Sequence, residues 1–137
     1  MEAKKPVLVV DDERASLELI CQVLDKLKFP ILCADKPAQA FDLFDDGGPF
    51  LVLTDLSLGN HVDGVTMADR MHLKDPLCIF IAISGYLDMW GIGYLLGSVF
   101  TDIIQKPFSI KLIEQVVTYA WDKHQRWGAL VNARTVS

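Results

Sequence analysis

The stretch VLVVDDE, from Val7 to Glu13, sets the pattern that the rest of the chain repeats. Its apolar run is bounded by Pro6 and by Asp11, which is typical of a short strand buried on both faces of a sheet. Apolar residues at helical spacing follow and predict a helix over residues 13–27. The chain therefore opens with a buried strand, an acidic pair and an amphipathic helix.

Apolar runs recur along the chain and predict further strands. They span residues 30–34, 51–54, 77–83 and 103–105. Segments with helical periodicity lie between them, and Pro or Gly stands at most junctions. Two of the predicted helices follow an N-cap, at Asp35 and at Ser109. Another begins near Asp63 and Gly64, and a further one lies between Asp88 and Val99. This alternation predicts a single doubly wound α/β domain, in which helices cover both faces of a parallel sheet.

The composition fits one domain in the cytoplasm. Half of the 137 residues are hydrophobic (51%), and the net charge is -5 with no basic stripe, so we expect no direct binding to nucleic acid. No apolar stretch reaches the roughly 18 residues of a membrane span, and no signal peptide is visible. Cys21, Cys33 and Cys78 are widely spaced among apolar residues, and we interpret them as reduced core cysteines.

Polar side chains stand where the predicted strands end. Asp11 and Asp12 follow the first strand, Asp55 the third, Ser84 the fourth and Lys106 the fifth. Right-handed crossovers bring these ends to one edge of the sheet, where open α/β sheets bind ligands. Crowded carboxylates repel one another unless a cation such as Mg²⁺ joins them, and Mg²⁺ commonly bridges carboxylates and a phosphate. The set predicts a metal-assisted phosphoryl site in which the Asp55 carboxylate is the nucleophile.

Over about residues 5–125 the chain resembles the receiver domain of two-component response regulators. The matching stretches are VLVVDDE (Val7–Glu13), LVLTDLSLG (Leu51–Gly59), DG (Asp63-Gly64), ISG (Ile83–Gly85) and QKPF (Gln105–Phe108). The resemblance implies a flavodoxin-like (βα)5 fold with strand order 2-1-3-4-5. It leaves residues 126–137 as a C-terminal tail or the start of a linker.

The resemblance also implies a metal site. Asp55 is the expected phosphoacceptor and also a metal ligand. Asp12, with Asp11 nearby, and the backbone carbonyl of Ser57 are expected to complete the site for Mg²⁺ or Mn²⁺.

Three more residues acquire roles from the same resemblance. Ser84 and Lys106 are expected to contact the phosphoryl group, and Pro107 is expected to follow a cis peptide bond. The implied function is a phosphorylation-controlled signalling receiver in a two-component phosphorelay. It would take its phosphoryl group from a histidine kinase or a phosphotransfer protein. It would promote only its own phosphorylation and dephosphorylation, so it would not be a metabolic enzyme.

The chain departs from the family on its output side. Family members often carry Tyr or Phe three residues before the lysine, but Ile103 stands there, and Tyr86 and Phe100 are the aromatic candidates for the missing switch. The segment from Tyr86 to Phe100, which includes Trp90 and Tyr94, is unusually apolar. A surface helix cannot bury all its faces, so this segment and the last strand predict a face for a downstream protein or a second copy.

Three other functions compete with this interpretation. A receiver-like adaptor would act by protein contact with little dependence on phosphate, and the apolar segment favours it. A haloacid dehalogenase-type hydrolase needs a second Asp two residues after the nucleophile, where this chain has Ser57. A flavodoxin needs a hydroxyl- and Gly-rich phosphate loop after the first strand, where Asp11 and Asp12 would repel a phosphate.

Overall fold

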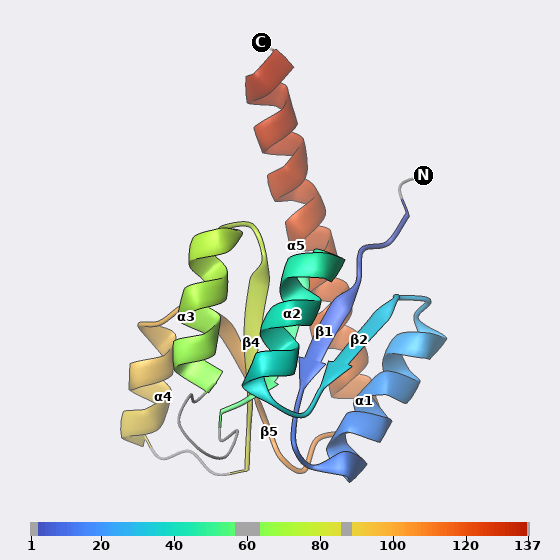
Figure 1. Ribbon diagram of the computed structural model, residues 1–137, viewed down its shortest axis with the longest axis vertical. Helices are drawn as coiled ribbons and strands as arrows, with labels where there is room; N and C mark the ends of the chain where they lie inside the picture. The colour runs from blue at the N-terminus through green and yellow to red at the C-terminus, as the bar shows by residue number, and fades with distance from the viewer. Residues whose placement is uncertain (1–2, 57–63, 86–88, 137) are drawn as a thin grey trace.

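The computed structural model describes residues 3–56, 64–85 and 89–136. Within them, parallel strands form one five-stranded sheet in the order β2-β1-β3-β4-β5, and helices alternate with the strands (Figure 1). The elements are β1 (Val7–Val10), α1 (Arg14–Lys26), β2 (Ile31–Ala34), α2 (Pro37–Gly47), β3 (Leu51–Asp55), α3 (Gly64–Lys74), β4 (Ile79–Ser84), α4 (Met89–Leu96), β5 (Phe100–Gln105) and α5 (Ile110–Val136). The predicted fold class and strand order are confirmed.

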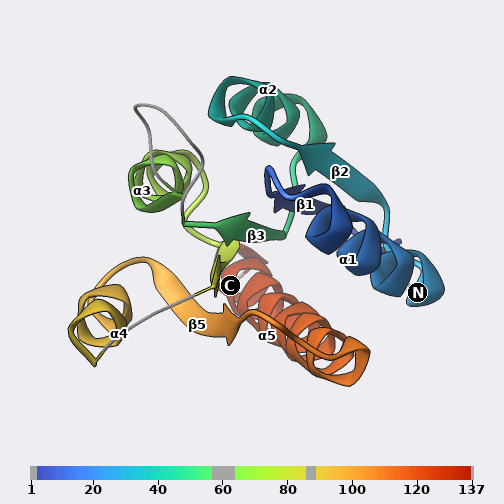
Figure 2. The ribbon, with the colours of Figure 1, turned by 90° about the horizontal axis from the view of Figure 1, so that it is seen from below.

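Helices cover both faces of the sheet, as the view along the strands shows (Figure 2). Ile20 of α1 and Val117 of α5 belong to the buried cluster on one face. Phe44 of α2, Met67 of α3 and Leu95 of α4 belong to the cluster on the other. Strands β1 and β4 are buried along their whole length, which explains their unbroken apolar runs.

Two strands begin more than one residue away from the predicted start. Strand β4 begins two residues later, because the N–H groups of Leu77 and Cys78 donate to the side-chain and backbone oxygens of Asp75 in a turn (3.1 and 3.3 Å). Strand β5 begins three residues earlier, at Phe100, which pairs with Phe80. Hydrophobicity alone therefore placed the ends of these strands within three residues.

The sequence predicted N-caps for α2 and α5, and only the second is confirmed. The N-cap of α2 is Lys36 and not Asp35, because a residue before proline prefers an extended backbone and Pro37 opens the helix. Lys36 has φ -139 and ψ 148 and makes no side-chain cap. The prediction for α5 is confirmed, since the N–H of Leu112 donates to Ser109 Oγ (3.1 Å).

Helix α5 continues beyond the expected domain boundary. It runs to Val136, and its last turns project past the sheet at the end opposite the carboxyl ends of the strands (Figure 1). Trp121 and Trp127 pack against the core beneath it, so the packed part of the molecule extends past residue 125. Residues 126–136 are thus helical, and their role as a tail or linker stays a prediction. No helix among the described residues combines the length and the apolar character needed to cross a bilayer.

Candidate functional site

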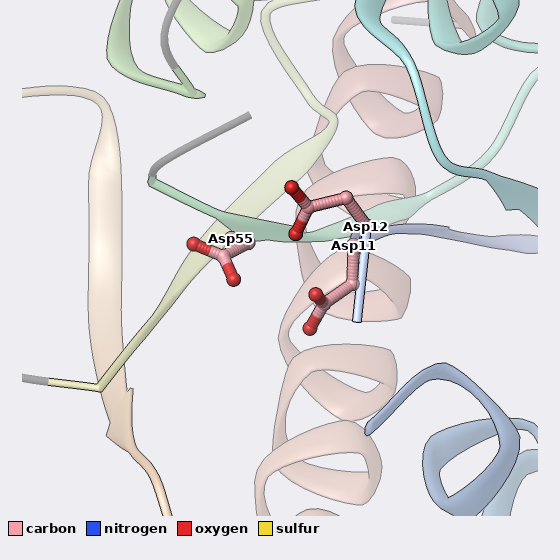
Figure 3. A group of neighbouring side chains, drawn as sticks. All are labelled: Asp11, Asp12 and Asp55. Carbon is pink, nitrogen blue, oxygen red and sulfur yellow. The ribbon is translucent and has the colours of Figure 1, made fainter. Parts of the chain in front are cut away.

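Three carboxylates meet at the carboxyl ends of the adjacent strands β1 and β3. Val10 of β1 pairs with Thr54 of β3, so the residues that follow, Asp11 and Asp55, stand side by side. The N–H of Asp11 also donates to the carbonyl of Ala34 at the end of β2 (3.1 Å). Figure 3 shows the three Asp side chains gathered about one space. One oxygen of each, including that of Asp12, lies within 4.8 Å of the others.

Lys106 connects two of these carboxylates. Its backbone N–H donates to the carbonyl of Ser84 (2.7 Å), which holds the end of β5 against the end of β4. Its ammonium lies 2.9 Å from Asp55 Oδ2 and 3.1 Å from Asp11 Oδ2. The bond to Pro107 is a cis peptide, as the resemblance implied. The cation is therefore held between the predicted phosphoacceptor and its acidic neighbour.

At Asp11 and at Lys106 alike, burial and the opposite charge nearby shift the pKa in opposite directions. Asp11 is fully buried, and this burial raises the pKa of its carboxyl, although the N–H of Glu13 and the Lys106 ammonium work against the rise. Burial lowers the pKa of Lys106, but its contacts with Asp55 and Asp11 outweigh that effect and raise the pKa overall. Lys106 is therefore a charged donor at neutral pH.

The donor set fits a hard divalent cation. Among the described residues, the buried Oδ2 of Asp11 accepts no hydrogen bond, even though the Lys106 ammonium lies close to it. One ammonium faces three carboxylates, so negative charge is in excess, and Asp12 is exposed to solvent. Oxygen donors with excess negative charge suit Mg²⁺, which keeps several of its waters. The predicted ligand Ser57 lies outside the described residues.

Other predicted site residues stand around this centre. Ser84 is nearly buried at the end of β4, one position beyond the residue that pairs with Asp55. Gly85, Lys106 and Pro107 line one groove at this edge of the sheet. Tyr86 lies outside the described residues. The structure thus brings Ser84 to the edge on which the three carboxylates stand.

Gly64 has a structural role that the sequence alone did not explain. Its N–H donates to the carbonyl of Leu56 (3.1 Å), closing the end of the loop that follows β3. A Cβ at this position would lie 2.4 Å from the carbonyl oxygen of Asp55, too close for any side chain without a backbone shift. The glycine after Asp63 therefore allows α3 to start directly against the backbone of Asp55.

Helix α4 exposes much of its apolar surface. Among its described side chains, Met89, Ile92, Tyr94 and Leu96 are exposed, and Leu95 alone of the large apolar residues points into the core. The side chain of Trp90 lies outside the described residues. The apolar segment was thus predicted correctly as more than a single buried stripe.

Phe100 and Ile103, which were predicted at the output face, are buried and partly buried respectively. Phe100 is only 4% exposed and belongs to the core beneath α4, so the structure removes it from the predicted interface. Ile103 is half-buried and packs against the same core. No aromatic ring occupies the position three residues before Lys106, so an aromatic switch there is absent by sequence.

The family model for the response regulator receiver domain matches residues 7–118. The chain belongs to this family. Receiver domains are typically signalling modules and not metabolic enzymes, and the family generally binds Mg²⁺ in an acidic pocket.

Individual relatives of this receiver are distant. A curated cyclic di-GMP phosphodiesterase of Thermotoga maritima is 24% identical over 114 residues, which is 83% of this chain and 30% of that protein. The crystal structure of NtrX from Brucella abortus has a TM-score of 0.88 at 24% identity and covers 95% of this chain and 30% of NtrX. The crystal structure of the isolated receiver domain of NtrX has a TM-score of 0.79 at 26% identity. The match covers 85% of this chain and 98% of that domain. The chain thus spans less than a third of the first two proteins.

The buried carboxyl of Asp11 gives a prediction for stability. The pKa of Asp11 is higher in the folded than in the unfolded protein, so the folded state favours the protonated carboxyl. The stability from this preference is fully present below the unfolded pKa of about 3.9 and is lost as pH rises through the folded pKa. Asp11→Asn is therefore expected to increase the free energy of unfolding at pH 7 without metal, by about 1 kcal/mol. The gain should shrink toward pH 3. Urea unfolding at both pH values checks this, with the exposed Asp122→Asn as control, and equal stability of variant and wild type at pH 7 would contradict it.

Proposed function

We propose that this chain is a phosphorylation-controlled receiver in a two-component phosphorelay, with Asp55 as the phosphoacceptor and Mg²⁺ as its cofactor. The observation that carries the proposal is the position of Lys106, whose ammonium touches both Asp55 and Asp11 (2.9 and 3.1 Å). A cation fixed beside the nucleophile and a cluster of carboxylates supplies the positioning and charge neutralisation that phosphoryl transfer needs.

The chemistry follows from these side chains. An Asp55 carboxylate oxygen attacks the phosphorus atom of a phosphohistidine, an O–P bond forms, and the N–P bond breaks as its electron pair leaves with the imidazole. Lys106 holds negative oxygens of the phosphoryl group, and the Ser84 hydroxyl donates a hydrogen bond to it. Bound Mg²⁺, held by Asp11, Asp12 and Asp55, would neutralise the charge of the carboxylates and the phosphoryl oxygens.

The partner that supplies the phosphoryl group is a histidine kinase or a phosphotransfer protein. The exposed apolar side chains of α4 are the proposed output face, which would bind a downstream protein or a second copy of the chain. Because Ile103 cannot act as an aromatic switch, the phosphoryl signal would reach α4 through the end of β4 and Ser84.

A second candidate function is an adaptor that binds its partner through α4 with little dependence on phosphate. The observation that favours it is the same exposed helix, in which Met89 and Tyr94 are 76% and 67% exposed. The three carboxylates with their lysine favour the receiver, because an adaptor has no use for crowded carboxylates.

Acetyl phosphate separates these two functions. With Mg²⁺, wild-type protein is expected to gain the mass of one phosphoryl group, and beryllofluoride is expected to change its Trp fluorescence. Removing the metal with EDTA should prevent both changes, and Ca²⁺ in place of Mg²⁺ provides a charge-matched control. If neither reagent alters the protein in the presence of Mg²⁺, the receiver proposal fails and the adaptor is favoured.

A further inference from the structure

Two cysteines that are distant in sequence meet between α1 and β2. Cys21 Sγ lies 2.8 Å from Cys33 Sγ, and both thiols are free and only partly buried. Cys33 shares its face of the edge strand with Ile31, which packs on the α1 and α5 side of the sheet. All three cysteines of the chain were predicted to be reduced core cysteines, and all three thiols are free. Cys78 is buried in the core as predicted, whereas Cys21 and Cys33 are only partly buried and lie in contact.

Solvent reaches the pair through an open groove of about 380 Å³. Besides the two cysteines, the groove is lined by Asp11, Asp12, Arg14, Leu17, Glu18 and Asp35. The thiols thus share one groove with two carboxylates of the phosphoryl site. Small polar reagents can enter it, whereas Cys78 is 3% exposed and lies in the core of the opposite face.

We propose that Cys21 and Cys33 form a reversible oxidation site, which a hydroperoxide converts into an intramolecular disulfide. The sulfurs need to approach by less than about 1 Å to reach the disulfide bond length of roughly 2.05 Å, starting from 2.8 Å. The closed loop would join helix α1 to the edge strand β2. This proposal is independent of phosphoryl transfer at Asp55.

The two sulfurs differ in their readiness to react. The two sulfurs share one hydrogen bond, in which either thiol can be the donor. This bond, opposed by burial, lowers the pKa of Cys33 to about 7. The same bond, together with burial, raises the pKa of Cys21. The thiolate is the nucleophilic form, so Cys33 is the sulfur that attacks the oxidant and Cys21 is the one that resolves the product.

The oxidation balances with one equivalent of hydrogen peroxide. The Cys33 thiolate attacks one peroxide oxygen, the O–O bond breaks, and the departing hydroxide takes a proton to become water, leaving a sulfenic acid. Cys21 sulfur then attacks Cys33 sulfur, the S–S bond forms, the S–O bond breaks, and a second water leaves with the Cys21 proton. The two sulfurs lose two electrons and the peroxide gains them; a dithiol reductant reverses the change.

A structural metal does not account for the pair. A closed zinc site takes four Cys or His ligands. In the described ranges, the one group of three or more metal-ligating side chains is the aspartate cluster, and it includes neither cysteine. Two thiols in contact, in a groove that solvent enters, fit oxidation better than metal binding.

Peptide mapping of the peroxide-treated full chain tests the proposal. Trypsin cleaves after Lys26, Lys28 and Lys74, so the three cysteines fall on separate peptides. We expect two of the three thiols to be lost, the Cys21 and Cys33 peptides to be linked, and dithiothreitol to restore both thiols. Cys78→Ala should retain the response, whereas Cys21→Ser and Cys33→Ser should each abolish the link.

Thermal unfolding gives a second readout that does not depend on mapping. The cross-link should raise the Tm of the oxidised wild type by roughly 5–15 °C, and a Cys21→Ala/Cys33→Ala double variant should show no such change with peroxide. The proposal is overturned if all three thiols persist in the folded protein while urea-unfolded protein oxidises. It is also overturned if the link involves Cys78 or joins two chains. Neither readout involves phosphorylation, so a failure here leaves the receiver proposal untouched.

Discussion

Asp55→Asn is expected to reduce the uptake of a phosphoryl group from acetyl phosphate to the limit of detection. The amide oxygen has the shape of the carboxylate oxygen but carries no negative charge, so it is a poor nucleophile toward phosphorus. The substitution also removes one anionic partner of the Lys106 ammonium, which lies 2.9 Å from Asp55 Oδ2. Mg²⁺ binding should weaken as well, because one of the three clustered carboxylates is lost.

Intact mass measured over time with acetyl phosphate and Mg²⁺ checks this prediction. Asp122→Asn is the matched control, since it makes the same chemical change on an exposed position of α5. The control should take up one phosphoryl group at the wild-type rate. Stoichiometric uptake by Asp55→Asn would show that another side chain accepts the phosphoryl group and would overturn the assignment of Asp55.

The site was predictable because it depends on topology more than on detail. Once a parallel sheet is inferred, the residues after each strand must share one edge, and Asp11 and Asp55 follow strands that pair directly. The sequence could also place Lys106 at that edge, since β5 ends just before it. What it could not give is the pair of ion contacts that Lys106 makes, because these depend on side-chain rotamers and on how the strands twist.

The features that sequence reasoning missed depend on local geometry or on register. Asp35 has the residue type of an N-cap, but the restriction that Pro37 places on its predecessor moves the cap to Lys36. The contact between Cys21 and Cys33 depends on how α1 rotates over β2, and a spacing of 12 residues carries no sign of it. A helix followed by a strand, with a Cys on each of the two surfaces that face one another, is the sequence pattern that could have predicted this contact.

Lys106→Met is expected to lower the free energy of unfolding by about 3 kcal/mol at neutral pH without metal. Among the described residues, Lys106 is the only cation in contact with Asp11 and Asp55. Removing it leaves the fully buried Asp11 without a positive partner. Because the folded pKa of Lys106 is raised, its contribution is complete below the unfolded value of about 10.4 and is lost as pH rises through the folded pKa. The difference between wild type and variant should therefore be steady from pH 7 to 9 and shrink above about pH 10.5.

Mg²⁺ should reverse much of this loss, because a divalent cation can replace the missing ammonium among the carboxylates. The variant is also expected to bind Mg²⁺ several-fold more tightly than the wild type, since no fixed positive charge opposes the metal. Urea unfolding with and without Mg²⁺ measures both effects, and Lys111→Met, exposed in the first turn of α5, is the matched control. If Lys106→Met and Lys111→Met unfold alike and respond equally to Mg²⁺, then Lys106 does not balance the acidic cluster, and the charge argument for the site is wrong.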